Sequence, residues 1–192
     1  MKQGFVKVAS ATPRIRVADP VYNAQVICEQ AKEAAEHGAK IVVFPELCIT
    51  GYTCNDLFLQ ELLLEKAKEA LLTIAEETGQ LETLFLVGLP VDKDGRLYNV
   101  AAVLYRGRIL GMIPKKNIPM YAEFYEGRHF TPGEETVTEY RLGKQVIPFG
   151  SNLLFRCEEL PELILGCELC EDLWVAEPPS TSHALMGATV IA

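Results

Sequence analysis

Two short apolar runs, each preceded by a helical pattern, place the strongest constraint on what this chain can fold into. The runs are IVVF (41–44) and LFLVGLP (84–90), and neither alternates apolar with polar residues. Such runs are typical of strands that are covered on both faces, because a strand with one face in water alternates. The sequence therefore predicts a layered α/β fold in which helices lie outside and apolar strands lie within.

The first helical pattern begins and ends at recognisable signals. Asp19 is the predicted N-cap, Pro20 occupies the first helical position, and apolar residues recur at helical spacing until Gly38. A second long helix is predicted to be capped at 55–56 and to end at Gly79. Each helix leads directly into one of the two apolar strands, so the chain begins with two helix-then-strand units.

The middle of the chain changes to an antiparallel pattern. LYNVAAVLY (97–105) and RILGMIPK (108–115) flank Arg106-Gly107, which predicts a hairpin. The segment 117–135 is rich in prolines, glycines and aromatic residues and is predicted to be a long ordered loop, a kind of segment that is usually functional. The remaining predicted elements are strands near 146–149, 153–157 and 163–169, a short helix over 180–187 and a strand that begins at 189–192.

Composition excludes several classes of function. The formal net charge is −8 and the longest basic run is Lys115-Lys116, so no basic stripe could neutralise nucleic-acid phosphates. No stretch approaches the ~18 continuous apolar residues of a membrane span, and the start of the chain has no apolar signal core. We therefore expect a cytoplasmic protein that binds neither nucleic acid nor a membrane. Its six cysteines are expected to be free thiols.

No repeat, low-complexity tract or linker marks a domain boundary, so residues 1–192 are predicted to form one domain or most of one. The chain stops inside the strand predicted at 189–192, with no cap, turn or polar tail after it. We therefore expect this domain to be incomplete at its carboxyl end.

Three predicted strands end at reactive side chains. IVVF runs into Glu46, RILGMIP runs into Lys115, and LILGCEL runs into Cys170. Because reactive groups collect where the strands of α/β sheets give way to loops, these three could converge on one cleft. A carboxylate can accept the thiol proton, the thiolate can attack a carbonyl carbon, and the ammonium can stabilise the resulting oxyanion. The set is sufficient for acyl transfer without a histidine.

Each of these residues also has an ordinary structural interpretation. A glutamate after a strand is usually solvated or caps a helix, a pair of lysines often ends a hairpin, and a cysteine is more often a small buried hydrophobe than a nucleophile. Taken singly, none of the three indicates catalysis. The hypothesis depends on their occurring together.

Other uses of the cysteines fit the sequence less well. Cys167 and Cys170 form a C-x-x-C, but a zinc site needs two further ligands at suitable spacing. A redox C-x-x-C is expected to open a helix, whereas Cys167 lies within the strand predicted at 163–169. A pairing of cysteine with His129 or His183 stays open, although neither histidine lies at a strand end.

Three segments resemble, in the same order, the motifs of the nitrilase superfamily. FPELCITGYTCNDLF (44–58) resembles its glutamate motif, PKKNIPMYAEFYEGRHFTPG (114–133) its lysine motif with the following loop, and GCELCEDLW (166–174) its cysteine motif. Within the superfamily, the GYT-C-x-DLF and Y-x-E-F-Y-E-x-R-x-F-x-P-G stretches resemble the glutaminase domain of glutamine-dependent NAD synthetases. The resemblance spans the whole chain.

The resemblance implies Glu46 as general base, Lys115 as the cation on the oxyanion side and Cys170 as nucleophile. Lys115 is preferred to Lys116 because the family's lysine directly follows its strand. We also expect Cys170 to be the most reactive of the six thiols, with a pKa lowered by the neighbouring ammonium.

Three further residues are implied as substrate-binding positions. Tyr121 and Glu126 match loop positions that the family uses near the substrate and the catalytic lysine. Glu171 is implied beside the nucleophile, where it orients the turn or caps the next helix. No metal ligand is implied for this part of the enzyme.

The resemblance also implies a fold and a reaction. The fold is a four-layer α-β-β-α sandwich, C-terminally truncated here, and some of the residues that would contact the α-amino and carboxylate groups of glutamine are expected past 192. The reaction is hydrolysis of the glutamine amide through a cysteine thioester, and its ammonia serves to amidate deamido-NAD to NAD. Hydrolysis needs no cofactor, whereas ATP and magnesium are implied only for the missing C-terminal synthetase domain that receives the ammonia.

Two other functions stay open on the sequence. The chain could be another nitrilase-branch amidohydrolase that acts on a free small amide. It could also be a catalytically silent scaffold that keeps the fold for assembly, since members of the family often associate through helix faces. A homo-oligomer is expected in either case.

Overall fold

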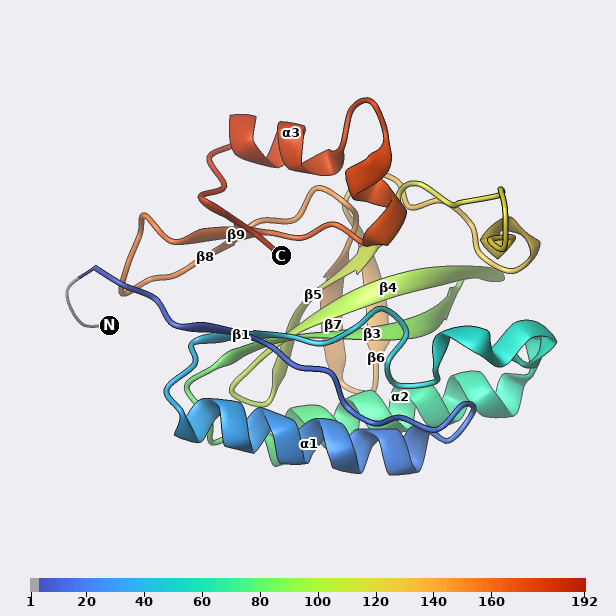
Figure 1. Cartoon of the computed structure of the whole chain (residues 1–192), viewed down its shortest axis with the longest axis horizontal. Helices are drawn as coiled ribbons and strands as arrows, with labels where there is room; N and C mark the ends of the chain where they lie inside the picture. The colour runs from blue at the N-terminus through green and yellow to red at the C-terminus, as the bar shows by residue number, and fades with distance from the viewer. Residues whose placement is uncertain (1–3) are drawn as a thin grey trace.

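A computed structural model describes residues 4–192 and stacks four layers, seen from bottom to top in Figure 1. Helices α1 and α2 form the lowest layer, a seven-stranded sheet lies on them, a three-stranded sheet follows, and α3 covers the top. This confirms the α-β-β-α sandwich expected from the sequence. The start of the chain, where no signal segment is expected, lies partly outside the described residues.

The seven-stranded sheet has the order β1-β2-β3-β4-β5-β7-β6. Its first three strands are parallel, as expected for strands joined through helices, and β3, β4 and β5 form an antiparallel meander. The strand β7 pairs parallel with β5 and antiparallel with β6. The strands are β1 (Val8–Ser10), β2 (Ile41–Val43), β3 (Leu84–Lys93), β4 (Arg96–Tyr105), β5 (Arg108–Pro114), β6 (Thr138–Leu142) and β7 (Gln145–Phe149).

The smaller sheet has the order β10-β9-β8 and lies over the larger one. The strand β9 pairs parallel with β10 and antiparallel with β8. The outer helix α3 (Pro179–Leu185) covers this sheet. The strands are β8 (Phe155–Arg156), β9 (Ile164–Gly166) and β10 (Val190–Ile191).

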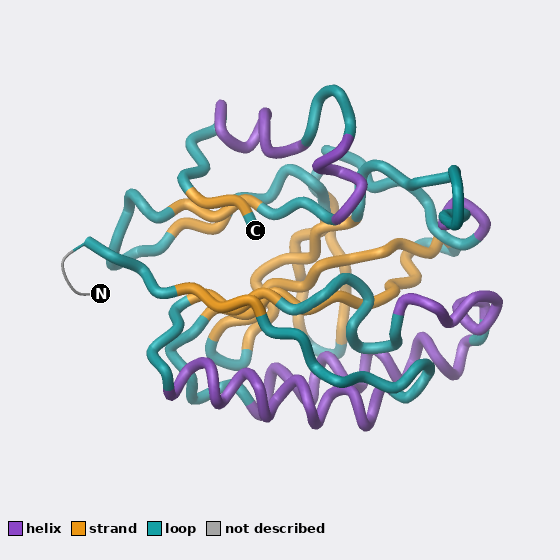
Figure 2. Tube along the Cα trace, in the orientation of Figure 1, coloured by secondary structure: helices purple, strands orange, loops and turns teal. Residues whose placement is uncertain are grey.

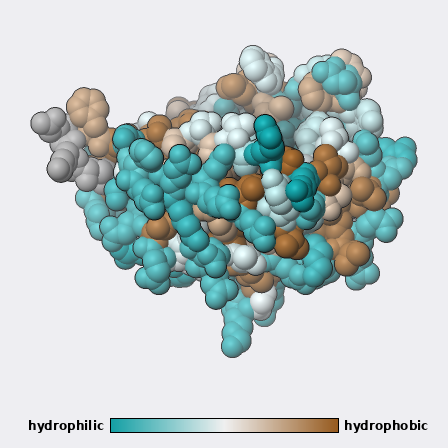
Figure 3. All heavy atoms as spheres, turned by 60° about the horizontal axis from the view of Figure 1, so that its bottom comes forward, coloured by the Kyte–Doolittle hydropathy of each residue, from teal (hydrophilic) through white to brown (hydrophobic). Residues whose placement is uncertain are grey.

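The helices α1 (Pro20–Glu36) and α2 (Glu61–Glu77) cover the far face of the larger sheet. Asp19 caps α1 as predicted, its carboxylate accepting from the Tyr22 amide at 3.1 Å. Figure 3 turns the face with these helices toward the viewer, and most of its atoms are hydrophilic. The amphipathic pattern thus buries one side of each helix and leaves the other in solvent. Among residues 4–192, no helix is both long and apolar enough to cross a bilayer.

Two apolar cores separate the layers. The larger lies between the two helices and the seven-stranded sheet and includes Ile27, Leu71 and Phe85, all essentially inaccessible. The smaller lies between the sheets and includes Val103 and Leu165. Strands that serve both cores are buried on both faces, which is why their sequences do not alternate. Each fully buried aliphatic side chain contributes about 1.5–3 kcal/mol relative to its exposed state.

Two sequence predictions are wrong in detail. The second long helix begins at Glu61, because a 3₁₀ segment, η1 (Tyr52–Leu59), precedes it and Asn55 adopts a positive φ of 50° that interrupts helical geometry. The strands β1 and β6 were not predicted from the sequence. Strand β1 has three residues and buries none of them, and β6 alternates and buries only Tyr140 and Leu142, so neither shows a continuous buried apolar run.

Candidate active site

The loops that follow β2, β5 and β9 bring Glu46, Lys115 and Cys170 together. Figure 2 shows these loops toward the same side of the molecule. The side chains meet because the larger sheet supplies two of the strand ends and the smaller sheet, stacked on it, supplies the third. The predicted convergence of the three strand ends is therefore present in the structure.

Lys115 lies at the centre of a buried ionic cluster. Its side chain is inaccessible to solvent, and Nζ lies 2.7 Å from Glu46 Oε1, 2.8 Å from Glu126 Oε1 and 3.0 Å from Glu126 Oε2. We call these three residues the buried centre. Two carboxylates therefore share one ammonium, which has three N–H donors. Lys116 lies outside this cluster and pairs with Glu135 in solvent.

The loop that carries Glu46 approaches β3 so closely that only glycine fits opposite it. A Cβ on Gly88 would lie 2.4 Å from the Leu47 amide nitrogen, and Leu47 itself has a positive φ of 53°. Asn99 of β4 then donates to Glu46 Oε1 at 2.7 Å. Because Lys115 and Asn99 both donate to Oε1, the second carboxylate oxygen of Glu46 is available to accept another proton.

Glu126 is held by groups from two other segments. The Tyr52 hydroxyl donates to Glu126 Oε1 at 2.8 Å, and Asn99 Nδ2 lies 3.4 Å from Oε2. Burial, followed by the hydrogen bond to Glu126, raises the pKa of Tyr52 well above its usual range. The tyrosine therefore remains a proton donor to the carboxylate at neutral pH.

Cys170 is the first residue of a short 3₁₀ turn, η3 (Cys170–Trp174), and is exposed to solvent. Its φ is +45°, a backbone conformation that residues other than glycine rarely adopt. Such strain persists only where surrounding contacts impose it and is common at functional sites.

The charges around Cys170 do not lower its pKa as expected from the sequence. Burial of the sulfur raises the pKa most, the Glu46 charge and a hydrogen bond to the Glu46 side chain raise it further, and Lys115 only partly offsets them. For Lys115, burial lowers the pKa, but Glu46 and Glu126 outweigh it and the net shift is upward. The resting pair is therefore a protonated thiol beside an ammonium, with Glu46 as the thiol's nearby base.

The other thiols are less accessible. Cys28, Cys48, Cys54 and Cys167 are buried, and Cys157 is half-buried. Burial raises the pKa of Cys48 and of Cys167 to about 12. Cys167 belongs to the core between the sheets, so it does not face the same side as Cys170. Within residues 4–192 no group of three His, Cys, Asp or Glu side chains could hold a metal ion.

Tyr121 and Glu171 form a hydrogen-bonded pair at the mouth of the site. The Tyr121 hydroxyl donates to Glu171 Oε2 at 2.7 Å, and this bond raises the pKa of Tyr121. Tyr121 is 54% exposed, so the pair lies at the solvent edge. We call these two residues the rim pair. It joins the loop after Lys115 to the turn that carries Cys170.

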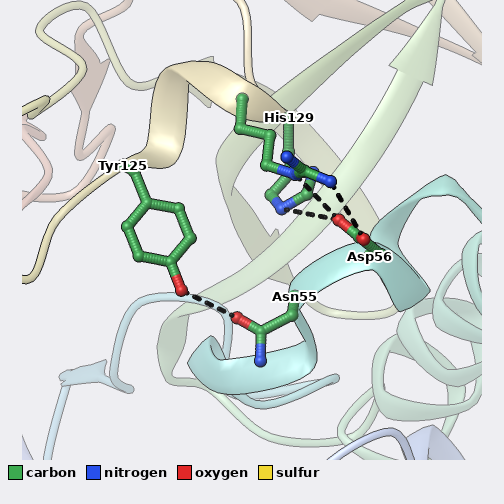
Figure 4. A pocket seen from close by; sticks show the side chains of 5 residues that line it. Asn55, Asp56, Tyr125 and His129 are labelled. Atoms are coloured by element: carbon green, nitrogen blue, oxygen red, sulfur yellow. Dashed lines mark hydrogen bonds and ion pairs between the residues drawn. The ribbon is translucent and has the colours of Figure 1, made fainter.

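The histidines do not pair with Cys170 in the part of the chain that the structure describes. Figure 4 shows His129 in a pocket with Asn55, Asp56 and Tyr125. Its Nε2 lies 3.8 Å from an Asp56 oxygen that also binds Arg128. The buried ring of His183 contacts the Ser151 carbonyl oxygen through Nε2 at 3.0 Å. Neither histidine is in a position to act on the thiol directly.

Three residues of the site were missed by sequence reasoning. Asn99 is the one polar side chain of an otherwise apolar stretch of β4, a signal that could have identified it, because a buried polar residue usually has a specific partner. Tyr52 lies in the GYT segment of the glutamate motif. Asp172 is buried behind the cysteine turn, one residue from the Glu171 that was chosen.

Comparison with known proteins supports this site's assignment to a family. Residues 7–192 match the model of the carbon–nitrogen hydrolase family. A glutamine-dependent NAD(+) synthetase of Mycobacterium tuberculosis is 41% identical over 191 residues, which is all of this chain and 28% of that protein. One from Thermotoga maritima is 32% identical over 96% of this chain and 28% of its own length. The chain thus spans less than a third of these curated relatives.

Solved structures agree on the fold. A glutamine-dependent NAD(+) synthetase from Cytophaga hutchinsonii superposes with a TM-score of 0.85 at 28% identity, covering 97% of this chain and 30% of that one. An amidase from Nesterenkonia sp. superposes with a TM-score of 0.70 at 23% identity, covering 97% of this chain and 63% of the amidase. The second likeness concerns the fold alone.

Proposed function

The chain belongs to the carbon–nitrogen hydrolase family, and we propose that it releases ammonia from the side-chain amide of glutamine through a thioester on Cys170. The observation that carries this proposal is the buried centre, in which Lys115 meets Glu46 and Glu126 beside an exposed thiol. The choice of glutamine is supported by the names of relatives that are 41% identical over the whole chain.

In the first half-reaction Glu46 accepts the proton of the Cys170 thiol as sulfur attacks the amide carbon. The electron pair of the C=O bond moves to oxygen, and the ammonium of Lys115 stabilises that negative charge. Collapse of the intermediate breaks the C–N bond, and the proton held by Glu46 goes to the leaving nitrogen. The products are ammonia and a γ-glutamyl thioester.

In the second half-reaction Glu46 takes a proton from water, and the resulting hydroxide attacks the thioester carbonyl. Lys115 stabilises the second oxyanion in the same way. The C–S bond breaks, glutamate leaves, and Glu46 returns its proton to the sulfur. The raised pKa of the Cys170 thiol suits this cycle, because the proton is present at the start and Glu46 is placed to take it.

Three further residues are proposed to bind the substrate or support the cluster. Tyr121 and Glu171 stand at the solvent edge, where a donor and a carboxylate could contact the α-carboxylate and α-amino groups of glutamine. Glu126 is proposed to fix the Lys115 ammonium next to the reacting carbonyl, since it contacts Nζ through both oxygens.

In a protein with the domain content of its relatives, the ammonia would serve a synthetase part that amidates deamido-NAD to NAD with ATP and magnesium. Hydrolysis by this chain requires neither. A homo-oligomer in the cytoplasm remains a prediction from the sequence.

The test is ammonia release from glutamine and from acetamide by the intact protein, its Cys170→Ala variant and its Cys157→Ala variant. We expect wild-type release from glutamine well above that from acetamide, loss of release with Cys170→Ala, and retention with the half-buried control Cys157→Ala. Equal rates on both amides would favour a small-amide hydrolase. No release from any amide would favour a silent scaffold.

A further inference from the structure

The carboxylate of Asp172 joins the loop that carries Lys115 to the turn that carries Cys170. The side chain is almost completely buried, with 2% of the residue exposed. Nothing in the proposed reaction uses it, and it is too enclosed to meet the substrate. A buried carboxylate is costly unless it is fully hydrogen-bonded, so its partners indicate what it is for.

All of the partners are N–H groups of the two catalytic segments. Oδ1 accepts from the Asn117 amide at 2.7 Å, the Asn117 side chain at 2.9 Å and the Lys116 amide at 3.1 Å. Oδ2 accepts from the Leu169 amide at 3.1 Å and also lies 3.4 Å from the Lys116 amide. The carboxylate therefore binds both the residues that follow Lys115 and the residue that precedes Cys170.

Within residues 4–192, no lysine, arginine or histidine side chain pairs with Asp172. Lys116 contacts it through its backbone amide, while its ammonium pairs with Glu135. The negative charge is balanced by oriented N–H dipoles instead, which gives short, charge-assisted hydrogen bonds. Because both oxygens are used, a neutral amide in the same place could satisfy only part of the set.

The contacts of Asp172 also enclose the strained residue. Its side chain accepts from the Leu169 amide, and its own amide donates to the Leu169 carbonyl at 3.0 Å, so Cys170 lies inside a closed loop of two hydrogen bonds. A positive φ at a cysteine needs contacts of this kind to persist. The same carboxylate therefore holds the turn and fixes its distance from the lysine loop.

We propose that Asp172 is a positioning residue for amide hydrolysis, which sets the placement of the Cys170 sulfur relative to Lys115 and Glu46. The inference rests on the proposed function where it is tested by the rate of ammonia release. It rests on the geometry alone where it is tested by the alkylation of Cys170. It explains how two loops from different sheets are joined beneath the exposed rim pair.

The test compares Asp172→Asn with Thr83→Val in the intact protein. Thr83 is equally buried and donates to the Ala39 carbonyl at 2.8 Å, but it precedes β3 and so lies at the opposite end of the sheet from Glu46. Asp172→Asn should lower kcat for ammonia release from glutamine ~10²-fold, because misplacing reacting groups by about 1 Å has that effect. KM should change by less than about threefold, since binding contacts remain.

The second readout is the alkylation of Cys170 by iodoacetamide as a function of pH, which needs no glutamine. The largest influences on the pKa of Cys170 are burial and the neighbouring Glu46, Lys115 and Glu126, so a sulfur that moves relative to these groups changes its midpoint. We expect Asp172→Asn to move this midpoint and Thr83→Val to leave it. If glutamine proves not to be a substrate, the proposed function fails, while the alkylation midpoint still tests the positioning role.

A second variant covers the case in which Asp172→Asn does not fold. Asn117→Ala removes the side-chain hydrogen bond from residue 117 and keeps the carboxylate, so it should shift kcat and the alkylation midpoint in the same direction by a smaller amount. Where Asp172→Asn does fold, the effect of Asn117→Ala should be smaller in the double variant, because the two side chains act through one contact. The proposal would be overturned if Asp172→Asn and Asn117→Ala gave the same kcat and the same alkylation midpoint as Thr83→Val at equal melting temperature.

Discussion

The buried centre and the rim pair use the same chemistry, a carboxylate and a donor, in opposite surroundings. Lys115 is inaccessible and meets Glu46 and Glu126, whereas Tyr121 is 54% exposed and meets Glu171 in solvent. Both contacts cross between segments far apart in the chain, and both measure about 2.7 Å. The lengths of these contacts are therefore alike, whereas their burial and the charge of the donor differ.

Burial decides what each contact can do. Charges removed from water interact more strongly, and removing one member of such a set leaves the others uncompensated. An exposed contact competes with water and contributes little to stability. The buried centre is thus suited to reaction chemistry, where charge must be stabilised without solvent, and the rim pair is suited to reversible contact with a substrate.

The largest effect should come from Glu46→Gln, which keeps the shape of the buried centre and removes its base. Glutamine turnover should fall ~10²–10⁴-fold, the usual contribution of a general base. At the same time the pKa of Cys170 should fall, because the Glu46 charge and hydrogen bond that raise it are gone. Alkylation of Cys170 should then begin at lower pH, even though catalysis is lost.

The control for these two opposite effects, lower turnover and alkylation at lower pH, is Glu135→Gln, which removes an exposed carboxylate paired with Lys116. It should change neither turnover nor the pH at which Cys170 is alkylated. If Glu46→Gln leaves turnover intact, Glu46 is not the base.

Lys115→Ala should have the next largest effect. Turnover should drop ~10²–10³-fold through loss of the oxyanion's cation. The protein should also lose about 3 kcal/mol in its free energy of unfolding, because two carboxylates are left without their buried partner. Lys116→Ala removes a solvated ion pair and should leave both rate and melting temperature nearly unchanged. Equal losses from the two substitutions would remove the reason for choosing Lys115.

The six thiols should differ in reactivity by exposure. Brief substoichiometric alkylation of the folded protein, read by peptide mass spectrometry, should label Cys170 first and Cys157 second. The reason is accessibility, because the pKa of Cys170 is raised and not lowered. Preferential labelling of Cys48, Cys54 or Cys167 would contradict the assignment.

The smallest effect should come from the rim pair. Tyr121→Phe removes one hydrogen bond at the solvent edge and should raise KM for glutamine by at most about tenfold, since such a bond contributes about 0.5–1.5 kcal/mol. Melting temperature and kcat should stay close to wild type. A fall in kcat as large as that of Lys115→Ala would show that the rim takes part in the chemical step.

The proximity of Glu46, Lys115 and Cys170 could be predicted because each residue follows a strand whose apolar run can be recognised in the sequence. The roles assigned to them remain predictions. Asn99 was missed but could have been identified in the same way, because it interrupts an apolar strand. Local patterns therefore identify what lies at strand ends and inside strands.

The partners supplied by loops could not be predicted in this way. Tyr52 reaches Glu126 from the irregular segment η1, in which Asn55 has a positive φ, and Asp172 turns inward after the positive φ of Cys170 while its neighbour Glu171 turns to the rim. Periodicity does not report positive φ values of this kind. The depressed pKa expected for Cys170 was wrong for a related reason, since the sequence shows the lysine but not the burial and carboxylates that outweigh it.

Acid quenching of the intact protein within milliseconds of mixing with glutamine tests the central claim most directly, because thioesters survive acid and can be located by peptide mass spectrometry. We predict that the peptide containing Cys170 gains the mass of glutamine less ammonia. Added hydroxylamine should divert the product to γ-glutamyl hydroxamate, and both signals should vanish in Cys170→Ala. Ammonia release that continues in Cys170→Ala, or an acyl group found on another residue, would contradict the account.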